Sequence, residues 1–259
     1  MVPAAFVFGD SVVDVGNNNH LLFSIAKSNY PHYGVDFAYG EPTGRFSNGK
    51  IPSDLVGTLP SPPPYLSIRH IWQNINKNVS ELGFGFGFGS GSIPLTECGQ
   101  RLYAYGARRF ALTGLPALGC APARRLPVKN QECDNELNSM CDTYNRMLKP
   151  MLQRFKSKHK GVSYTYFDAY TFFLDVVNNA SRYGFSETKA ACCGVGKLEA
   201  EFLCTPFSDY CEDRNKYMFF DRIHPTEAMY RHVVDAIIDG PSKYVAPMNI
   251  RKLVSEHAS

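Results

Sequence analysis

Two short segments at opposite ends of the chain constrain the fold more than any other feature. Residues 4–8 form an apolar run that fits a buried parallel strand and leads directly into Gly9-Asp10-Ser11. More than two hundred residues later, Asp221 stands three residues before His224. A serine hydroxyl, a histidine and a carboxylate are the parts of a nucleophile, base and orienting-group relay. A carboxylate at this spacing can reach the second imidazole nitrogen within one turn.

Between these segments, apolar patterns alternate between strand and helix periods. This alternation predicts one domain spanning residues 1–259, built as a three-layer α/β/α sandwich around a parallel sheet. Further strands are expected at residues 110–114 and 162–170, and helices at residues 51–59, 95–106, 132–159, 172–178 and 226–239.

Several segments depart from this regular pattern. Pro150 should kink or split its helix, because proline lacks the amide hydrogen. Residues 30–65 are rich in proline and glycine and are expected to form a long loop that builds the binding crevice. Residues 83–90 alternate glycine with phenylalanine, which fits either a strand with one aromatic face or a low-complexity segment without stable structure. Residues 190–216 read as a cysteine-rich loop.

The charge pattern argues against a nucleic-acid partner. Net charge is +3, and the basic residues are scattered, with only short pairs such as Arg108-Arg109 and Arg124-Arg125. Such pairs are typical of a solvated surface. No apolar run reaches the roughly 18 residues that a transmembrane helix needs. The first residues enter a strand at once, so we expect no signal peptide in this chain and infer that a secretory leader is missing from it.

The cysteines point to an oxidising compartment. Eight are present, mostly in loop-like stretches, together with N-glycosylation sequons at Asn78 and Asn179. An even number in such positions favours disulfides, whose pairing the sequence leaves open. The zinc alternative is weaker, because no Cys-x-x-Cys pair or paired histidine cluster completes a ligand set. No metal or organic cofactor is expected.

Several blocks in a fixed order resemble the plant GDSL esterase/lipases of the SGNH hydrolase superfamily. The Gly-Asp-Ser motif alone would be weak, but the blocks cover most of the chain apart from residues 70–100. They are residues 6–19 (FVFGDSVVDVGNNN), 33–37 (YGVDF), 42–50 (PTGRFSNGK), 62–66 (PPPYL), 105–110 (YGARRF), 114–122 (GLPALGCAP), 191–194 (ACCG) and 220–227 (FDRIHPTE).

The resemblance implies a flavodoxin-like order of the strands in the sheet and a role for each candidate residue. It makes Ser11 the nucleophile, His224 the base and Asp221 the group that orients the imidazole. Asp10 is not a member of this triad, and a turn-capping or orienting role is expected for it. It also implies an oxyanion hole formed by the backbone of Ser11 and by Gly91, with Gly89 as the second choice. The Gly-x-Ser-x-Gly elbow of the α/β-hydrolases is absent from the sequence, which argues against that larger fold.

One expected block is missing. The family draws an oxyanion donor from a Gly-x-Asn-Asp sequence after its third strand, and this sequence occurs nowhere in the chain. A parallel connection takes about a dozen or more residues, so two crossovers and a strand do not fit before residue 110. We therefore expect an internal deletion near residues 92–100 that removes a central strand of the sheet.

Three functions remain open at this point. The first is a carboxylester hydrolase that acts through a serine acyl-enzyme on lipid esters or acylated small molecules, and this function implies an extracellular protein. The second is a silent family member that binds ligand without turnover, which the missing block favours. The third, a cysteine hydrolase using Cys192 or Cys193, is the weakest, because disulfides explain adjacent loop cysteines better. Substrate-binding residues and oligomeric state are beyond the sequence.

Overall fold

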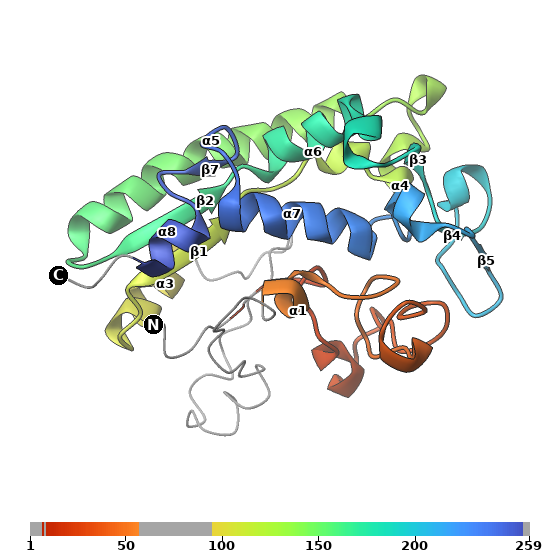
Figure 1. Cartoon of the computed structure of the whole chain (residues 1–259), viewed down its shortest axis with the longest axis horizontal. Coiled ribbons are helices and arrows are strands. Elements are labelled where there is room, and N and C mark those ends of the chain that lie inside the picture. Colours follow the sequence, from red (N-terminus) through yellow and green to blue (C-terminus); the bar gives the residue numbers. More distant parts are fainter. Residues whose placement is uncertain (1–6, 8, 57–94, 256–259) are drawn as a thin grey trace. The chain divides into compact units, whose positions relative to one another are not determined.

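The computed structural model describes Val7 and residues 9–56 and 95–255, which fall into two compact units (Figure 1). One unit combines the N-terminal part with residues 184–231, and the other combines residues 94–183 with residues 232–259. Helix α7 (Glu227–Asp239) begins in the first unit and ends in the second. The prediction of a single domain therefore stays a prediction.

The second unit is built around a three-stranded sheet in the order β1-β2-β7. Strands β1 and β2 are parallel, with Arg109 opposite Ser163 and Thr113 opposite Phe167, and β7 pairs with β2 in the antiparallel sense. Its elements are α3 (Leu95–Ala104), β1 (Arg109–Thr113), α4 (Pro122–Arg125), α5 (Asn135–Lys158), β2 (Ser163–Phe167), α6 (Ala169–Asn178), β7 (Val245–Ala246) and α8 (Ile250–Ser255), with 3-10 turns at Leu118–Cys120, Lys129–Gln131 and Ala180–Tyr183.

Helices cover both faces of this sheet. Leu148 and Leu152 of α5 pack against Tyr164 and Tyr166 of β2, and α5 runs along β1 and β2 in Figure 1. Thr165 points to the opposite face, because side chains alternate along a strand, and it donates to the carbonyl of Met248 just before α8. This arrangement confirms the predicted α/β class with parallel strands and helices on two sides.

Helix α5 corrects the expectation of a split at Pro150, whereas a kink there stays a prediction. The helix is continuous from its N-cap, Asp134, whose carboxylate accepts from the amide of Leu137 at 3.0 Å. Leu148 and Leu152 are buried on either side of the proline. Most helical stability in proteins comes from packing an apolar face. That packing outweighs the single hydrogen bond that proline removes.

The first unit contains less regular structure. Strand β3 (Glu187–Ala191) pairs in parallel with β6 (Tyr217–Phe219), and β4 (Cys193–Gly194) pairs antiparallel with β5 (Asp209–Tyr210). The expected cysteine-rich loop therefore contains short strands. The N-terminal part holds α1 (Pro52–Val56) and the 3-10 turns Asn17–His20 and Ala38–Gly40, with residues 41–50 irregular as predicted.

Disulfides confirm the interpretation of the cysteines. Cys192 bonds to Cys211 and Cys193 to Cys204 in the first unit, and Cys120 bonds to Cys133 in the second. These six sulfurs are therefore not zinc ligands. Cys141 is a buried free thiol, and Cys98 lies outside the described side chains.

Other predictions fall on residues outside the described part of the chain. They include the first strand apart from Val7, the alternating segment at residues 83–90, the end of the loop at residues 57–65 and the predicted deletion up to residue 94. Within the described ranges, no helix is both long and apolar enough to span a membrane.

Candidate active site

Ser11 sits in a tight turn that its neighbours shape. The amide of Val13 donates to the carbonyl of Asp10 at 3.2 Å, and the Asp10 carboxylate accepts from the amide of Val12 at 3.0 Å. An aspartate that bonds a backbone amide two residues on forms an Asx turn. Asp10 thus has the turn-capping position that was expected, and Ser11 is held at the start of the turn.

Asp221 and His224 lie in a second tight turn, between β6 and α7. Phe219 and Pro225 form a β-bridge across its base, and the amide of Phe220 donates to the carbonyl of His224 at 2.8 Å. One oxygen of the Asp221 carboxylate accepts from the amides of Ile223 and His224, at 2.8 and 2.7 Å. This local ring of bonds directs the other oxygen toward the imidazole.

Three side chains that the sequence placed together do meet. The Ser11 hydroxyl lies 2.7 Å from Nε2 of His224, and Nδ1 of His224 lies 2.7 Å from Oδ2 of Asp221. An ionised carboxylate can only accept hydrogen bonds. The proton of the neutral imidazole therefore sits on Nδ1, which donates to Asp221. Nε2 is left to accept from the Ser11 hydroxyl, as a general base requires.

Electrostatics hold Asp221 ionised. Burial alone would raise the pKa of this carboxyl, since its side chain is only 4% exposed, but the charge and hydrogen bonds of His224 outweigh burial and lower the pKa. Burial likewise disfavours a charged imidazole, yet Asp221 raises the pKa of His224 above its ordinary value of 6.5, with a smaller contribution from Asp10. The neutral, proton-accepting form of His224 therefore predominates only above this raised pKa.

Residues 33–50 form a loop, here called the bracing loop, that surrounds the turn of Asp221 and His224. The Tyr33 hydroxyl donates to Oδ2 of Asp221 at 2.7 Å, and the buried Phe46 ring lies 4.8 Å from the imidazole of His224 between ring centroids. Tyr33, Phe46 and Phe220 belong to one buried apolar cluster with three of the disulfide cysteines. An apolar wall of this kind excludes water from one side of the relay.

The bracing loop is also bonded to the backbone that follows His224. The Ser47 hydroxyl donates to the carbonyl of Pro225 at 3.2 Å, and the Asn48 amide oxygen accepts from the amide of Glu227 at 2.9 Å. The Glu227 carboxylate in turn accepts from the amide of Lys50 at 2.7 Å. A side chain at Gly49 would collide with that carboxylate, so the Glu227 side chain would have to move away from the Lys50 amide.

The same loop is tied to the segment that follows Ser11. Arg45 forms a two-pronged ion pair with Asp54, both bonds at 2.8 Å, and also donates to the carbonyl of Val15 at 3.3 Å. The Ser53 hydroxyl in α1 donates to the carbonyl of Val13 at 2.9 Å. The loop expected to form a binding crevice thus joins the two ends of the candidate site.

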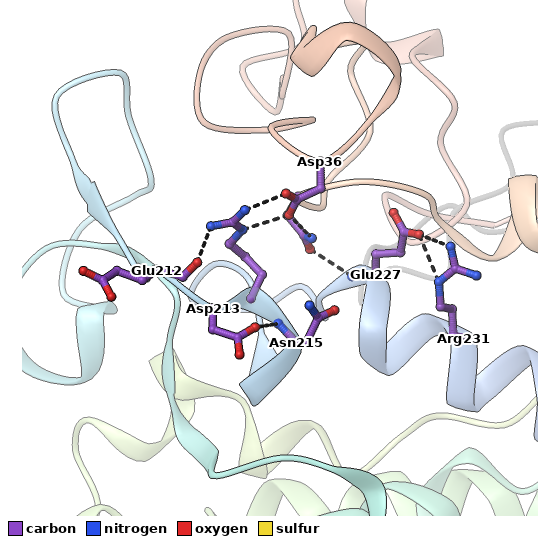
Figure 2. A pocket seen from close by; sticks show the side chains of 8 residues that line it. Asp36, Glu212, Asp213, Asn215, Glu227 and Arg231 are labelled. Carbon is purple, nitrogen blue, oxygen red and sulfur yellow. Dashed lines mark hydrogen bonds and ion pairs between the residues drawn. The ribbon is translucent and has the colours of Figure 1, made fainter.

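A charged cavity of about 340 Å³ lies on the other side of the bracing loop (Figure 2). Arg214 donates to both oxygens of Asp36, and Arg231 pairs with Glu227. The Asn48 side chain links the two pairs through Asp36 and Glu227. These mutual bonds give the charged residues a structural role, because they hold the bracing loop against Arg214 and against the start of α7. The lining residues are Asp36, Asn48, Glu212, Asp213, Arg214, Asn215, Glu227 and Arg231.

The candidate residues divide into two groups. Ser11, Asp221 and His224 are brought together, whereas Gly91 and Gly89 lie outside the described residues. The sequence analysis missed Tyr33 and Phe46 as parts of the site. Both stand in the blocks at residues 33–37 and 42–50 that carried the family resemblance, which was the available signal.

Comparison with known proteins identifies the family of the chain. The family model described as GDSL-like lipase/acylhydrolase matches residues 66–237. GDSL esterase/lipase At5g55050 of Arabidopsis thaliana is 35% identical over 341 aligned residues, which cover 98% of this chain and 90% of the relative. GDSL esterase/lipase At1g29670 of the same plant is 32% identical, with 88% of this chain and 84% of the relative covered.

The chain belongs to the GDSL lipase/acylhydrolase family. Its enzymatic class is therefore that of the ester hydrolases, with an ester as the kind of substrate. The alignment with At5g55050 spans 341 positions, more than the 259 residues of the whole chain, so part of that relative has no counterpart here.

Proposed function

We propose that this protein is a serine-dependent carboxylester hydrolase that acts through an acyl-enzyme on lipid esters or acylated small molecules. The observation that carries the proposal is the continuous relay from Ser11 through His224 to Asp221, with both links at 2.7 Å. Nothing else in the described part of the first unit joins a hydroxyl nucleophile to a base that is itself oriented by a buried carboxylate.

In the proposed reaction, Oγ of Ser11 attacks the ester carbonyl while its proton moves to Nε2 of His224. Asp221 stabilises the imidazolium that forms, because the pair is buried and hydrogen-bonded. The imidazolium then protonates the leaving alcohol, which yields the acyl-enzyme. Water, deprotonated by the same imidazole, releases the acid and restores Ser11.

The oxyanion hole belongs to the proposal as well. Ser11 would supply its backbone amide and Gly91 a second amide, and the chain lacks the Gly-x-Asn-Asp block that supplies a third donor in the family. Loss of one such donor costs about 10²–10³ in rate in well-studied hydrolases. We therefore expect slow turnover, and the missing block is the observation that favours the alternative, a silent family member that binds ligand.

The substrate class draws support from an exposed apolar segment that follows Ser11 in the sequence. Leu22, Phe23 and Ile25 follow the nucleophile in the sequence, and their side chains are at least 90% exposed. Exposed apolar side chains suit contact with acyl chains or a lipid surface. We propose long-chain esters as the first substrates to screen.

We also propose that the protein passes through the secretory pathway. Three disulfides support this location, since such bonds persist in oxidising compartments. The sequon at Asn179 supports it too, because that residue is exposed at the C-cap of α6. Release of N-glycans from the secreted protein, with a mass shift that Asn179→Gln reduces by one glycan, would test both statements.

The internal deletion near residues 92–100 stays a proposal. The excess of aligned positions over chain length supports it. Sequencing the transcript across the codons of this segment tests it: a contiguous junction establishes the shortened chain, and inserted codons for a further strand contradict it.

Covalent labelling with a fluorophosphonate probe tests the proposed function directly. We expect the parent protein to be labelled on Ser11 and the Ser11→Ala variant to be unlabelled, with Ser157→Ala as a matched control at an exposed serine of α5 in the second unit. A folded parent that takes up no label would overturn the hydrolase proposal in favour of the silent family member. Labelling that survives Ser11→Ala would exclude Ser11 as the nucleophile.

A further inference from the structure

Asp221 receives one hydrogen bond from outside its own turn. Of the four bonds that it accepts, those from the amides of Ile223 and His224 and from the imidazole all arise within the segment 221–224. The fourth comes from the hydroxyl of Tyr33, 188 residues away in the sequence, at 2.7 Å. Tyr33 therefore links the orientation of the carboxylate to the bracing loop.

The Tyr33 bond falls on the oxygen that matters for the relay. Oδ2 of Asp221 accepts both the Tyr33 hydroxyl and Nδ1 of His224, whereas Oδ1 accepts the two backbone amides. Two donors on one oxygen share its negative charge. The phenol thus fixes the direction of Oδ2 and also moderates how strongly this oxygen attracts the imidazole proton.

The phenol is itself held rigidly. The Tyr33 residue is 4% exposed, and its ring makes edge contacts with Tyr30, Phe46 and Phe220 at centroid distances of 5.4, 6.0 and 5.5 Å. The Gly34 amide that follows donates to the carbonyl of Ser47 at 2.9 Å. A hydroxyl on such a fixed ring can hold a carboxylate in a single orientation.

We propose that Tyr33 is a positioning residue for the Asp221–His224 pair, one that fixes the carboxylate and limits the basicity of the imidazole. This inference rests on the proposed function for its kinetic consequences but not for its structural one. The role differs from that of a merely structural tyrosine, because loss of the hydroxyl alone should change the titration of His224.

The direction of that change follows from the charges around the pair. Without the phenol, Oδ2 bears its full charge toward the imidazole, so the protonated form of His224 gains stability and its pKa rises further. The other titratable groups that act on the pair are Asp10, which raises the pKa of His224, and Tyr30 and Tyr230, whose own pKa values Asp221 raises. All three remain in place in a Tyr33→Phe variant.

Tyr33→Phe is the primary test, with Tyr217→Phe as the matched control. Tyr217 packs against the same apolar cluster, and its hydroxyl makes none of the four bonds to Asp221. The His224 pKa is read by NMR titration of the imidazole, which needs no turnover. We expect it to rise in Tyr33→Phe and to match the parent in Tyr217→Phe. An unchanged pKa in Tyr33→Phe would overturn the inference.

Kinetics supply a second, independent reading. Because Tyr33 donates a hydrogen bond to a charged group, Tyr33→Phe should lower kcat about tenfold and leave KM unchanged. The acid limb of kcat/KM should move to higher pH. In an Asp221→Asn background the same change should cost almost nothing. An equal cost in both backgrounds would show that Tyr33 acts elsewhere and would contradict the proposal.

Failure of the proposed function and failure of the Tyr33→Phe variant to fold both leave the role of Tyr33 testable. If the parent is not labelled by the fluorophosphonate probe, the proposed function fails, while the NMR titration still decides the role of Tyr33. If Tyr33→Phe does not fold, a fluorinated tyrosine at this position replaces it. Fluorination makes the phenol a stronger donor, so the His224 pKa should fall, and a rise or no change would overturn the inference.

Discussion

In the described part of the chain, tyrosine hydroxyls hold two carboxylates, Asp221 and Asp175, and the first of these lies in the candidate active site. Asp221 in the first unit accepts from Tyr33 and from the imidazole of His224. Asp175 of α6 in the second unit accepts from Tyr183 and Tyr244, at 2.5 and 2.7 Å, and pairs with Lys243 at 3.2 Å.

The difference lies in what each carboxylate holds. Burial and the bond to this carboxylate raise the pKa of Tyr183, and hydrogen bonds to Tyr244 and Asp175 raise the pKa of Lys243, so neither group changes its charge near neutral pH. The partner of Asp221 is an imidazole whose second nitrogen meets a serine hydroxyl. The tyrosine bonds of Asp175 thus serve to stabilise the fold. Asp221 differs because a titratable imidazole lies between its carboxylate and the Ser11 hydroxyl, which is the arrangement that the proposed relay needs.

The sharpest test of this comparison replaces both carboxylates by amides. Asp221→Asn should lower kcat by about 10³–10⁴, because an amide that donates to Nδ1 places the imidazole proton on Nε2. Asp175→Asn should leave kcat within about twofold, since it touches no part of the relay. Esterase assays on both variants, beside their thermal unfolding curves, check the prediction. Equal losses of activity would break the comparison.

The disulfides provide the next largest difference. Replacing Cys192 and Cys211 by serine removes a bond with a sequence separation of 19 and should lower the free energy of unfolding by about 3 kcal/mol. Activity should fall as well, because Cys192 packs in the cluster with Tyr33 and Phe46. The same change at Cys120 and Cys133 should lower stability by a similar amount with little effect on activity. Denaturant unfolding and probe labelling distinguish the two.

The pH dependence of activity follows from the raised pKa of His224. The base is inactive when protonated, so kcat/KM should fall as pH drops through a value above 6.5. Asp221→Asn removes the charge that raises this pKa, so the acid limb of its residual activity should move to lower pH. A pH–rate profile with the limb below 6.5 in the parent would contradict the electrostatic argument.

The smallest expected effect is on stability, at Asp175. Its pKa is lowered to about 2 by hydrogen bonds from Tyr183 and Tyr244. Because the folded pKa lies below the ordinary 3.8, the stabilisation is fully present above 3.8 and is lost as pH falls toward 2. Since the group lies near the surface, Asp175→Asn should cost only about 1 kcal/mol at neutral pH. An equal difference between parent and variant at pH 2 would count against this assignment.

The fold and the relay were accessible from sequence to different degrees. Strand β2 and helix α7 were expected within a few residues of their observed bounds, because long apolar patterns with clear flanking signals report burial directly. The break at Pro150 was not observed, since packing on both sides of the proline is a tertiary effect. Short strands β4 and β5 were missed because two residues carry no periodicity.

The sequence by itself determined the chemistry of the relay, because the Gly-Asp-Ser turn and the Asp-x-x-His spacing are local and each is built by bonds between near neighbours. Only the tertiary structure decided which distant residues support it. Tyr33 donates to Asp221, which lies 188 residues away in the sequence, and Cys192 forms its disulfide with Cys211 rather than with another cysteine. Such pairings depend on how loops close in space, and no local pattern records that closure.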